Sequence, residues 1–265
     1  MPYSIMMDAG HGGQDPGAVY SERQEKDDTL DLTLAVGEIL QNNGINVEYT
    51  RTTDVYLTPI ARAIEANNAG VDLFISIHRN SFPRDNEVSG VETLVYNLSG
   101  LKLEIAEEIN DQLEAIGFVN LGVKARPNLV VLKRTRMPAV LVEAGFINSN
   151  TDNELFDANF SAISQAIAFA ILDVLEENNL ISDTSETDTP SNVTDSVYSV
   201  QVGAFRNQTY ANRLLNELLE MDFPAYLDDS GEFYRVGVGG YQTLNDAVEM
   251  ERRLKQEGYP TVIVY

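Results

Sequence analysis

The sequence predicts an α/β protein, in which a mostly parallel sheet is covered by helices and is followed by a small α+β domain. Three observations lead to this prediction. Residues 3–180 alternate apolar strand-like runs with amphipathic helix-like segments, an order typical of a parallel sheet covered by helices. Residues 181–196 are rich in Ser, Thr, Asp and Pro, and residues 197–265 contain an internal repeat.

The elements of the first region follow from hydrophobic periodicity. Short apolar runs predict strands at 5–7, 45–49, 73–77, 90–96, 129–132 and 139–142. Apolar residues at helical spacing predict helices at 27–41, 59–68, 101–116 and 159–177. Thr58 and Pro59 mark the start of one helix as its N-cap and first helical residue. The continuous apolar run at 73–77 is expected of a strand buried on both faces.

The rest of the chain divides into a linker and a second domain. A segment as polar as 181–196 buries too little apolar surface to offset its ordering entropy, and we interpret it as a flexible linker. In the repeat, residues 198–205 match residues 234–241, and a helix and a strand are expected after each copy. Two such βαβ copies predict a four-stranded sheet with two helices on one face, the ferredoxin-like arrangement. The expected domains are therefore 1–180 and 197–265.

Composition excludes several classes of function. The chain has 41 acidic and 18 basic side chains and a formal net charge of −23. Binding to nucleic acid or to an anionic membrane surface needs a basic face, so neither is expected. There is no cysteine, which excludes disulfides and thiolate metal sites. We also expect no membrane span and no secretory signal, since long apolar stretches and a basic leading segment are missing from this sequence.

The two histidines are the strongest indication of chemistry. His11 and His78 are the only histidines, and each ends a short apolar run. Imidazole is the commonest ligand of catalytic metals and the usual group for proton transfer near neutral pH. Without cysteine, a metal site in this chain needs histidine and carboxylate ligands.

Two glutamates are expected close to these histidines. Glu143 ends the predicted strand 139–142, and Glu25 lies at the start of the first helix. The carboxyl ends of parallel strands share one edge of a sheet, so all four side chains are expected to meet there. Two histidines, one carboxylate and an open position match a catalytic zinc site, with a second carboxylate as general base.

Each interpretation has an ordinary alternative. By spacing alone, Glu25 could be one of several acidic residues that favour a helix N-terminus. Glu143 is harder to explain in that way, because an acid after an apolar run needs a partner or a function. The glycines at 10–13 could instead form a phosphate-binding loop, but they lack the spacing of the known fingerprints.

Five ordered motifs resemble the zinc-dependent N-acetylmuramoyl-L-alanine amidases of bacterial cell walls. They lie at 8–18, 25–27, 50–54, 76–80 and 138–146, and the resemblance covers about residues 3–178. It implies one zinc ion held by His11, Glu25 and His78, with Glu143 as the catalytic residue. It implies cleavage of the amide bond between N-acetylmuramic acid and the L-alanine of the stem peptide.

The same resemblance also indicates where substrate contacts are expected. Asn80 and Arg79, which follow the second histidine, are candidate substrate-binding residues. Arg79 is a departure, because the family usually has a small residue there. Ser149 stands where the family usually has Asn.

The second region resembles SPOR domains, through the segments 200–205 and 234–239. That resemblance implies binding to peptidoglycan, preferentially to glycan strands that lack stem peptides. The candidate binding residues on the sheet are Gln201, Phe205, Arg235 and Tyr241. The aromatic residues could equally pack under the loops.

The resemblance therefore implies a peptidoglycan hydrolase of wall remodelling or of mother-cell lysis during sporulation. Two alternatives remain: a catalytically inactive protein that binds or regulates the wall, and a zinc peptidase acting on stem peptides. Without a signal peptide, the enzyme is expected to accumulate in the cytoplasm of the mother cell and then reach the wall. Secretion is expected instead if the natural protein carries a leader that this sequence lacks.

Overall fold

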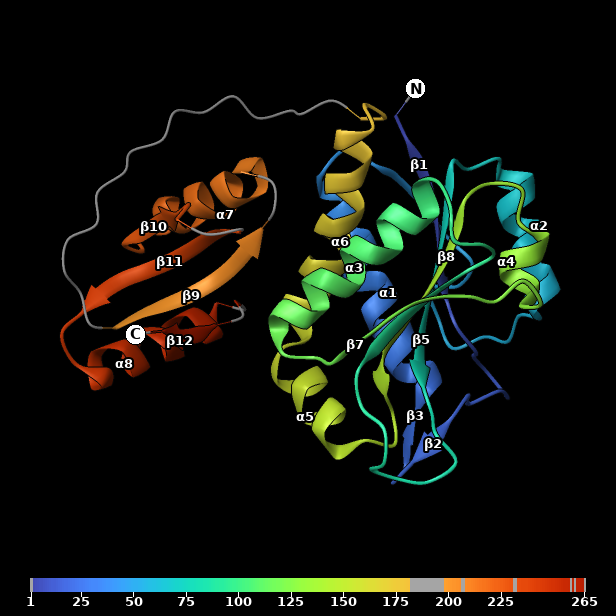
Figure 1. Cartoon of the computed structure of the whole chain (residues 1–265), viewed down its shortest axis with the longest axis horizontal. Helices are drawn as coiled ribbons and strands as arrows, with labels where there is room; N and C mark the ends of the chain where they lie inside the picture. The colour runs from blue at the N-terminus through green and yellow to red at the C-terminus, as the bar shows by residue number, and fades with distance from the viewer. Residues whose placement is uncertain are drawn as a thin grey trace. The chain divides into compact units, whose positions relative to one another are not determined.

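The computed structural model describes residues 2–181, 198–205, 208–230, 233–257, 259 and 261–264. The chain divides into two compact units, Met1–Ile181 and Ser182–Tyr265 (Figure 1). Except for Ile181, the predicted linker at 181–196 lies outside the described residues.

The first unit is built on a six-stranded sheet in the order β4-β1-β5-β8-β6-β7. The strands in chain order are β1 Ser4–Ala9, β4 Asn46–Tyr49, β5 Leu73–Asn80, β6 Val91–Val95, β7 Asn120–Ala125 and β8 Ala139–Phe146. Every strand pair is parallel except β6 with β8, which is antiparallel. A separate short hairpin consists of β2 Val19–Tyr20 and β3 Arg23–Gln24. This mixed but mostly parallel sheet confirms the predicted fold class.

Helices cover both faces of this sheet (Figure 1). The helices are α1 Glu25–Asn42, α2 Pro59–Ala69, α3 Leu101–Ile116, α4 Val130–Arg134, α5 Asn150–Ala158 and α6 Phe160–Glu177. Thr58 caps α2 as predicted, since its side chain accepts a hydrogen bond from the Ala61 N–H. On one face, Ala66 of α2 and Leu132 of α4 pack in a buried cluster with Phe74 of β5. Helices α1, α3 and α6 pack together on the other face.

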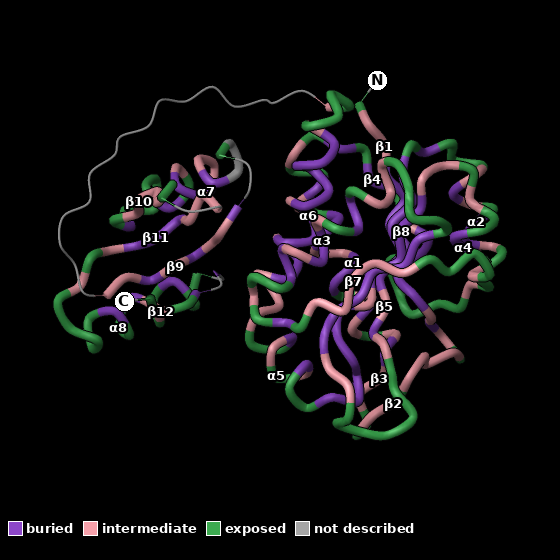
Figure 2. Tube along the Cα trace, viewed as in Figure 1, coloured by how far each residue is buried: buried purple, intermediate pink, exposed green. Residues whose placement is uncertain are grey.

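The central strands of this sheet are buried along most of their length (Figure 2). The side chains of Ile5, Ile75 and Val140 are inaccessible to solvent. Continuous apolar runs therefore form the strands that lie between two helical layers, as the sequence predicts.

One predicted strand is wrong, and one strand of the sheet is not predicted. The apolar run 129–132 predicts a strand, but Val130–Arg134 is a short helix. A four-residue apolar run fits either a buried strand or one turn of helix, so its periodicity does not distinguish them. The sixth strand is instead β7, whose half-buried residues include Gly122 and Lys124 and lack a strong apolar pattern.

The second unit has the predicted ferredoxin-like topology. Its elements are β9 Tyr198–Phe205, α7 Gln208–Glu220, β10 Ala225–Asp228, β11 Tyr234–Tyr241, α8 Leu244–Gln256 and β12 Val262–Val264. The strand order is β10-β11-β9-β12, and neighbouring strands are antiparallel. Both helices contact the central strands β9 and β11, where Val200 and Val236 are fully buried.

Within the part of the chain that the structure describes, no helix taken alone has the length and apolar character needed to cross a membrane. Helices α5 and α6 together have the required length and apolar character, but they are bent by 83° relative to each other.

Candidate metal centre

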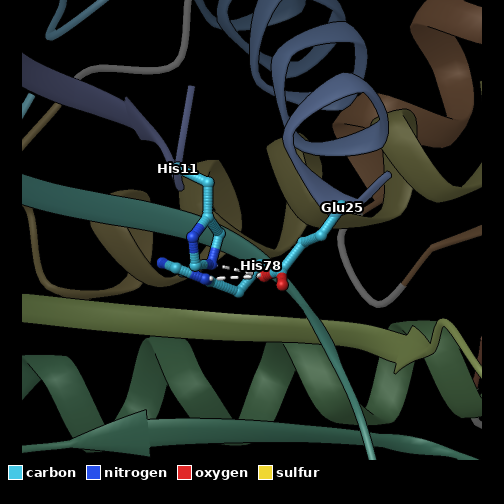
Figure 3. A group of neighbouring side chains, drawn as sticks. All are labelled: His11, Glu25 and His78. Atoms are coloured by element: carbon cyan, nitrogen blue, oxygen red, sulfur yellow. Dashed lines mark hydrogen bonds and ion pairs between the residues drawn. The ribbon is translucent and has the colours of Figure 1, made fainter. Parts of the chain in front are cut away.

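Three potential metal ligands converge at the carboxyl edge of the parallel strands (Figure 3). His11 follows β1, Glu25 is the first residue of α1, and His78 lies near the end of β5. One ligand atom from each residue lies within 4.8 Å of the other two. Glu25 Oε1 is 3.1 Å from His11 Nε2 and 2.9 Å from His78 Nδ1. Four side chains are expected to meet at this edge. The ligand atoms of these three converge closely enough to bind one ion.

Glycines make this convergence possible. A side-chain carbon at Gly17 would lie 2.6 Å from Glu25 Oε2 and 2.7 Å from His11 Cδ2, and Gly17 has a φ of +67°. A side-chain carbon at Gly10 would overlap the His78 ring. Both positions therefore need a residue without a Cβ, and Gly17 also needs one that tolerates positive φ.

Two buried arginines hold the backbone that carries His11. Arg62 donates to the carbonyl oxygens of Ala9 and His11, each at 2.5 Å. Arg51 donates to the carbonyl oxygens of Ala9 and Gly10, each at 2.9 Å. The buried Asp8 carboxylate pairs with Arg62 at 2.8 Å, so this cation is compensated. The first histidine thus lies on a loop whose carbonyl groups are fixed from two sides.

A carboxylate outside the triad orients His11. Asp15 Oδ2 lies 2.9 Å from His11 Nδ1, the ring nitrogen opposite the one that faces Glu25. A carboxylate on the far nitrogen of a ligand histidine fixes its tautomer and its ring orientation. The sequence does not predict the roles of Asp8, Asp15, Arg51 and Arg62, because their contacts leave no signal in residue spacing.

The electrostatics of the triad favour its charged forms. Burial raises the pKa of Glu25, but hydrogen bonds from His11 and His78 more than offset burial and hold this pKa well below its ordinary range. Burial lowers the pKa of both histidines, but the neighbouring Glu25 raises it by more. The pKa of each histidine is therefore above its ordinary value. Zinc binds the neutral imidazoles and releases these protons. Two neutral imidazoles and an ionised carboxylate with converging ligand atoms then fit a divalent cation such as zinc.

Glu143 lies beside the triad on the neighbouring strand. It is the register partner of His78, which places the two side chains on one face of the sheet. Burial, followed by the charges of Glu25 and Glu92, raises the pKa of Glu143 to about 7. Its Oε2 atom is buried and has no hydrogen-bond partner among the described residues. Such a carboxylate is placed to accept a proton.

Comparison with known proteins agrees with this arrangement. Residues 5–173 match the family model of N-acetylmuramoyl-L-alanine amidase. The chain belongs to this amidase family. Residues 194–265 match the model of the SPOR domain, so both families that the motifs resemble are confirmed.

Relatives and solved structures support the assignment. The chain is 34% identical to the sporulation-specific N-acetylmuramoyl-L-alanine amidase of Bacillus subtilis, over 79% of this chain and 78% of that protein. It is 32% identical to the amidase CwlM of Bacillus licheniformis, over 83% of each chain. An amidase structure from Clostridium difficile matches with a TM-score of 0.62 and 30% identity, covering 66% of this chain and 97% of that one.

A cleft of about 260 Å³ leads to the triad of the amidase domain. His11 and His78 line it together with Leu57 and Pro59 on one side and residues 128–131 on the other. The cleft thus lies between the start of α2 and the start of α4. Two of the three donors, His11 and His78, are therefore accessible from this cleft.

Asn80 lies two residues beyond His78 and is half-buried. Its Nδ2 atom donates to Glu92 Oε1 at 2.9 Å, and Glu92 also pairs with Lys124. Glu92 is the register partner of Glu143 across β6 and β8. Asn80 therefore belongs to a polar row that continues from the triad towards the edge strand β7.

The structure does not support Arg79 as a substrate-binding residue. Its side chain is 1% exposed and points away from the triad, because neighbouring residues on a strand face opposite sides. The guanidinium donates to Asp28 and Asn153 and lies over the ring of Phe156 at 4.1 Å. Burial lowers its pKa to about 10. Arg79 thus ties β5 to α1 and α5.

In the SPOR domain the candidate residues have different environments. Phe205 is 3% exposed, so it packs inside the domain and is not available to a ligand. This matches the alternative in which the aromatic residue packs under the surface. Gln201, Arg235 and Tyr241 are half-buried on the strands β9 and β11.

Proposed function

We propose that this amidase is zinc-dependent and that His11, Glu25 and His78 hold one zinc ion. The bond cleaved is the amide between N-acetylmuramic acid and the L-alanine of the stem peptide. The observation that carries the proposal is the convergence of these three donors, with Glu143 on the neighbouring strand and both histidines lining a cleft. Their types and number leave a coordination position free for substrate or water, as in catalytic zinc sites.

The chemistry divides between the ion and the protein. When it is bound, zinc supplies polarisation of the amide carbonyl and lowers the pKa of a water molecule. Glu143 accepts the proton of the attacking water on its buried oxygen and later donates it to the nitrogen of the leaving alanine. A carboxyl group whose pKa lies near 7 serves both steps, because it exchanges a proton readily at neutral pH.

The surroundings keep these groups in place during the reaction. Asp15 orients His11 through Nδ1, and Arg62 fixes the carbonyl group of the same residue. Fixed ligands need no reorganisation when charge develops on the substrate. Asn80, half-buried beside Glu92, contacts the substrate next to the scissile bond.

The SPOR domain is proposed to hold the enzyme on its polymer. Gln201, Arg235 and Tyr241 lie on its sheet and are the proposed contacts to glycan strands that lack stem peptides. A tether between the two domains raises the local concentration of substrate. Cosedimentation of the domain with amidase-treated and untreated peptidoglycan tests this preference.

The cellular role is proposed from the resemblance to a sporulation-specific relative. The enzyme would remove stem peptides in wall remodelling or in lysis of the mother cell. Each cleavage would create a new stretch of bare glycan for the SPOR domain, so binding would follow hydrolysis along the wall.

The variant Glu143→Gln tests the proposed mechanism. The substitution keeps the size of the side chain but removes the base, so we expect the zinc content to stay at one ion per chain. The rate of amide cleavage should fall by at least about 10²-fold, the usual contribution of a general base. Elemental analysis measures the metal, and mass spectrometry of wall fragments identifies the bond cleaved.

Two results would contradict the proposal. Full activity of the Glu143→Gln protein would remove Glu143 from the reaction. Fragments cut within the stem peptide, with the muramoyl amide intact, would indicate a zinc peptidase instead.

A further inference from the structure

Positive charge is concentrated in one segment of this acidic protein. Residues 115–142 contain five basic side chains and no acidic one, although the whole chain has a net charge of −23. The five are Lys124, Arg126, Lys133, Arg134 and Arg136. Among the described residues, only Lys124 of these five forms an ion pair with an acidic side chain. In the part of the chain that the structure describes, the other four cations have no acidic partner.

Part of this basic segment lies at the cleft. The segment includes β7, the connection after it, and α4. Residues 128–131 line the cleft that contains His11 and His78. Arg126 is exposed shortly before these residues, and Lys133 and Arg134 are exposed at the end of α4. The cleft-lining residues 128–131 are therefore flanked in sequence by exposed cations, which favour an anionic ligand there.

Lys124 is positioned by one ion pair and keeps donors for a second partner. Its ammonium group pairs with the largely buried carboxylate of Glu92, which also accepts a hydrogen bond from Asn80. The Lys124 side chain is 39% exposed. An ammonium group has three donors, so those that do not bind Glu92 are available to a second anion.

Strand register places Lys124 in a row with Leu94 and Leu141, and Leu141 lines the cleft. His78, Glu143 and Glu92 are successive register partners on three neighbouring strands, and Lys124 reaches Glu92 from the fourth. Strands are about 4.8 Å apart, so His78 and Glu92 are separated by roughly 10 Å. An extended peptide covers that distance in about three residues. Lys124 therefore lies within reach of a substrate that extends a few residues from the metal centre along this row.

We propose that Lys124 and Arg126 bind carboxylate groups of the stem peptide and make this amidase selective for anionic stems. The proposal rests on the proposed function in one respect, the identity of the scissile bond. In that substrate the lactyl carboxyl group of the sugar is consumed in the amide bond, so free carboxylates lie on the peptide. We therefore expect the peptide to lie on the side of the cleft where Lys124, Arg126 and Asn80 are found.

The test compares two soluble muramoyl peptides that differ only in their charge. One has free peptide carboxylates, and in the other these groups are amidated. We expect kcat/KM of the wild-type enzyme to be about tenfold higher for the free acid, as two exposed charge pairs allow. Arg126→Gln should reduce this ratio to about threefold, and Arg126→Lys should largely restore it. Added salt should also reduce the ratio.

Two further variants complete the design. Glu92→Gln combined with Lys124→Gln removes the cation without leaving a buried charge unpaired, and should also lower the ratio. Lys102→Gln is the matched control, since Lys102 lies on α3, against the opposite face of the sheet, and its charge should not affect the ratio.

The outcomes separate this inference from the proposed function. Equal kcat/KM for both substrates in the wild-type enzyme would overturn the inference and leave the amidase mechanism intact. Equal losses on both substrates in Arg126→Gln would also overturn it, because they would indicate a structural role. Failure of the wild-type enzyme to cleave the muramoyl amide in either substrate would contradict the proposed function itself.

Discussion

Two glutamates at the same edge of the sheet have opposite pKa shifts. Hydrogen bonds from two imidazoles keep Glu25 ionised although its side chain is only 5% exposed. Glu143 has no such donor on its buried Oε2 atom among the described residues, and burial raises its pKa to about 7. Environments that separate the pKa values of neighbouring carboxyl groups often assign their roles. Here they favour Glu25 as a ligand and Glu143 as a proton carrier.

The raised pKa of Glu143 predicts a pH-dependent effect on stability. Its folded-state pKa of about 7 exceeds the ordinary value of 4.5, so ionisation of Glu143 destabilises the fold as the pH rises between these values. Glu143→Gln removes that cost. In metal-free protein we expect the variant to be more stable than the wild type by roughly 1–3 kcal/mol at pH 8.

Urea unfolding at two pH values checks this expectation. Near pH 4 the carboxyl group is largely protonated in both states, so the difference in free energy of unfolding should nearly disappear. A difference that is the same at pH 4 and pH 8 would show that ionisation of Glu143 is not its cause.

The loop after β1 depends on glycine for a reason that can be tested. Gly17 has a positive φ, and a side-chain carbon there would overlap Glu25 and His11. Gly17→Ala should weaken zinc binding at least tenfold, because it displaces two ligands, and should destabilise the fold by about 1–2 kcal/mol. Competition with a metal-binding dye measures the affinity.

Gly44 provides a matched control for this substitution. It has a φ of +81°, but nothing lies within 4 Å of the position that a side-chain carbon would occupy. Gly44→Ala should therefore impose similar backbone strain without changing zinc affinity. Equal affinities of the two variants would contradict the claim that contact with the ligands makes Gly17 necessary.

The elements differ in how well the sequence predicts them. Strands β1, β5 and β8 are buried on both faces, and their apolar runs predict them directly. The edge strand β7 and the short helix α4 are not predicted, because a half-buried strand and a single apolar turn lack a distinctive period. The start of α4 lines the cleft, so this side of the cleft is harder to predict than the metal ligands.

In the candidate site, too, the sequence predicts some residues and not others. The rarity and position of His11 and His78 predict them as ligands, and the motif resemblance selects Glu25 among its acidic neighbours. The contacts of Asp15 and Arg62 depend on side chains reaching backbone groups or ring nitrogens after folding. The prediction for Arg79 is wrong because a shift of one residue along a strand changes the face of the sheet that a side chain occupies.

The whole molecule combines a catalytic unit with a second, smaller unit. Each has its own buried core, around Phe74 in the first and around Val200 in the second. The net charge of −23 disfavours unspecific binding to anionic polymers, which makes the basic segment at the cleft a local exception. Under the proposed function, catalysis and attachment to the wall are assigned to separate units of one chain.

The most direct test of the central claim is a crystal structure of the zinc-loaded protein with anomalous diffraction at the zinc edge. We expect one zinc peak about 2.0–2.2 Å from His11 Nε2, His78 Nδ1 and an oxygen of Glu25. Glu143 should be close to the ion without binding it directly. A zinc peak that is bound by other residues, or that lacks any one of these three ligands, would contradict the account.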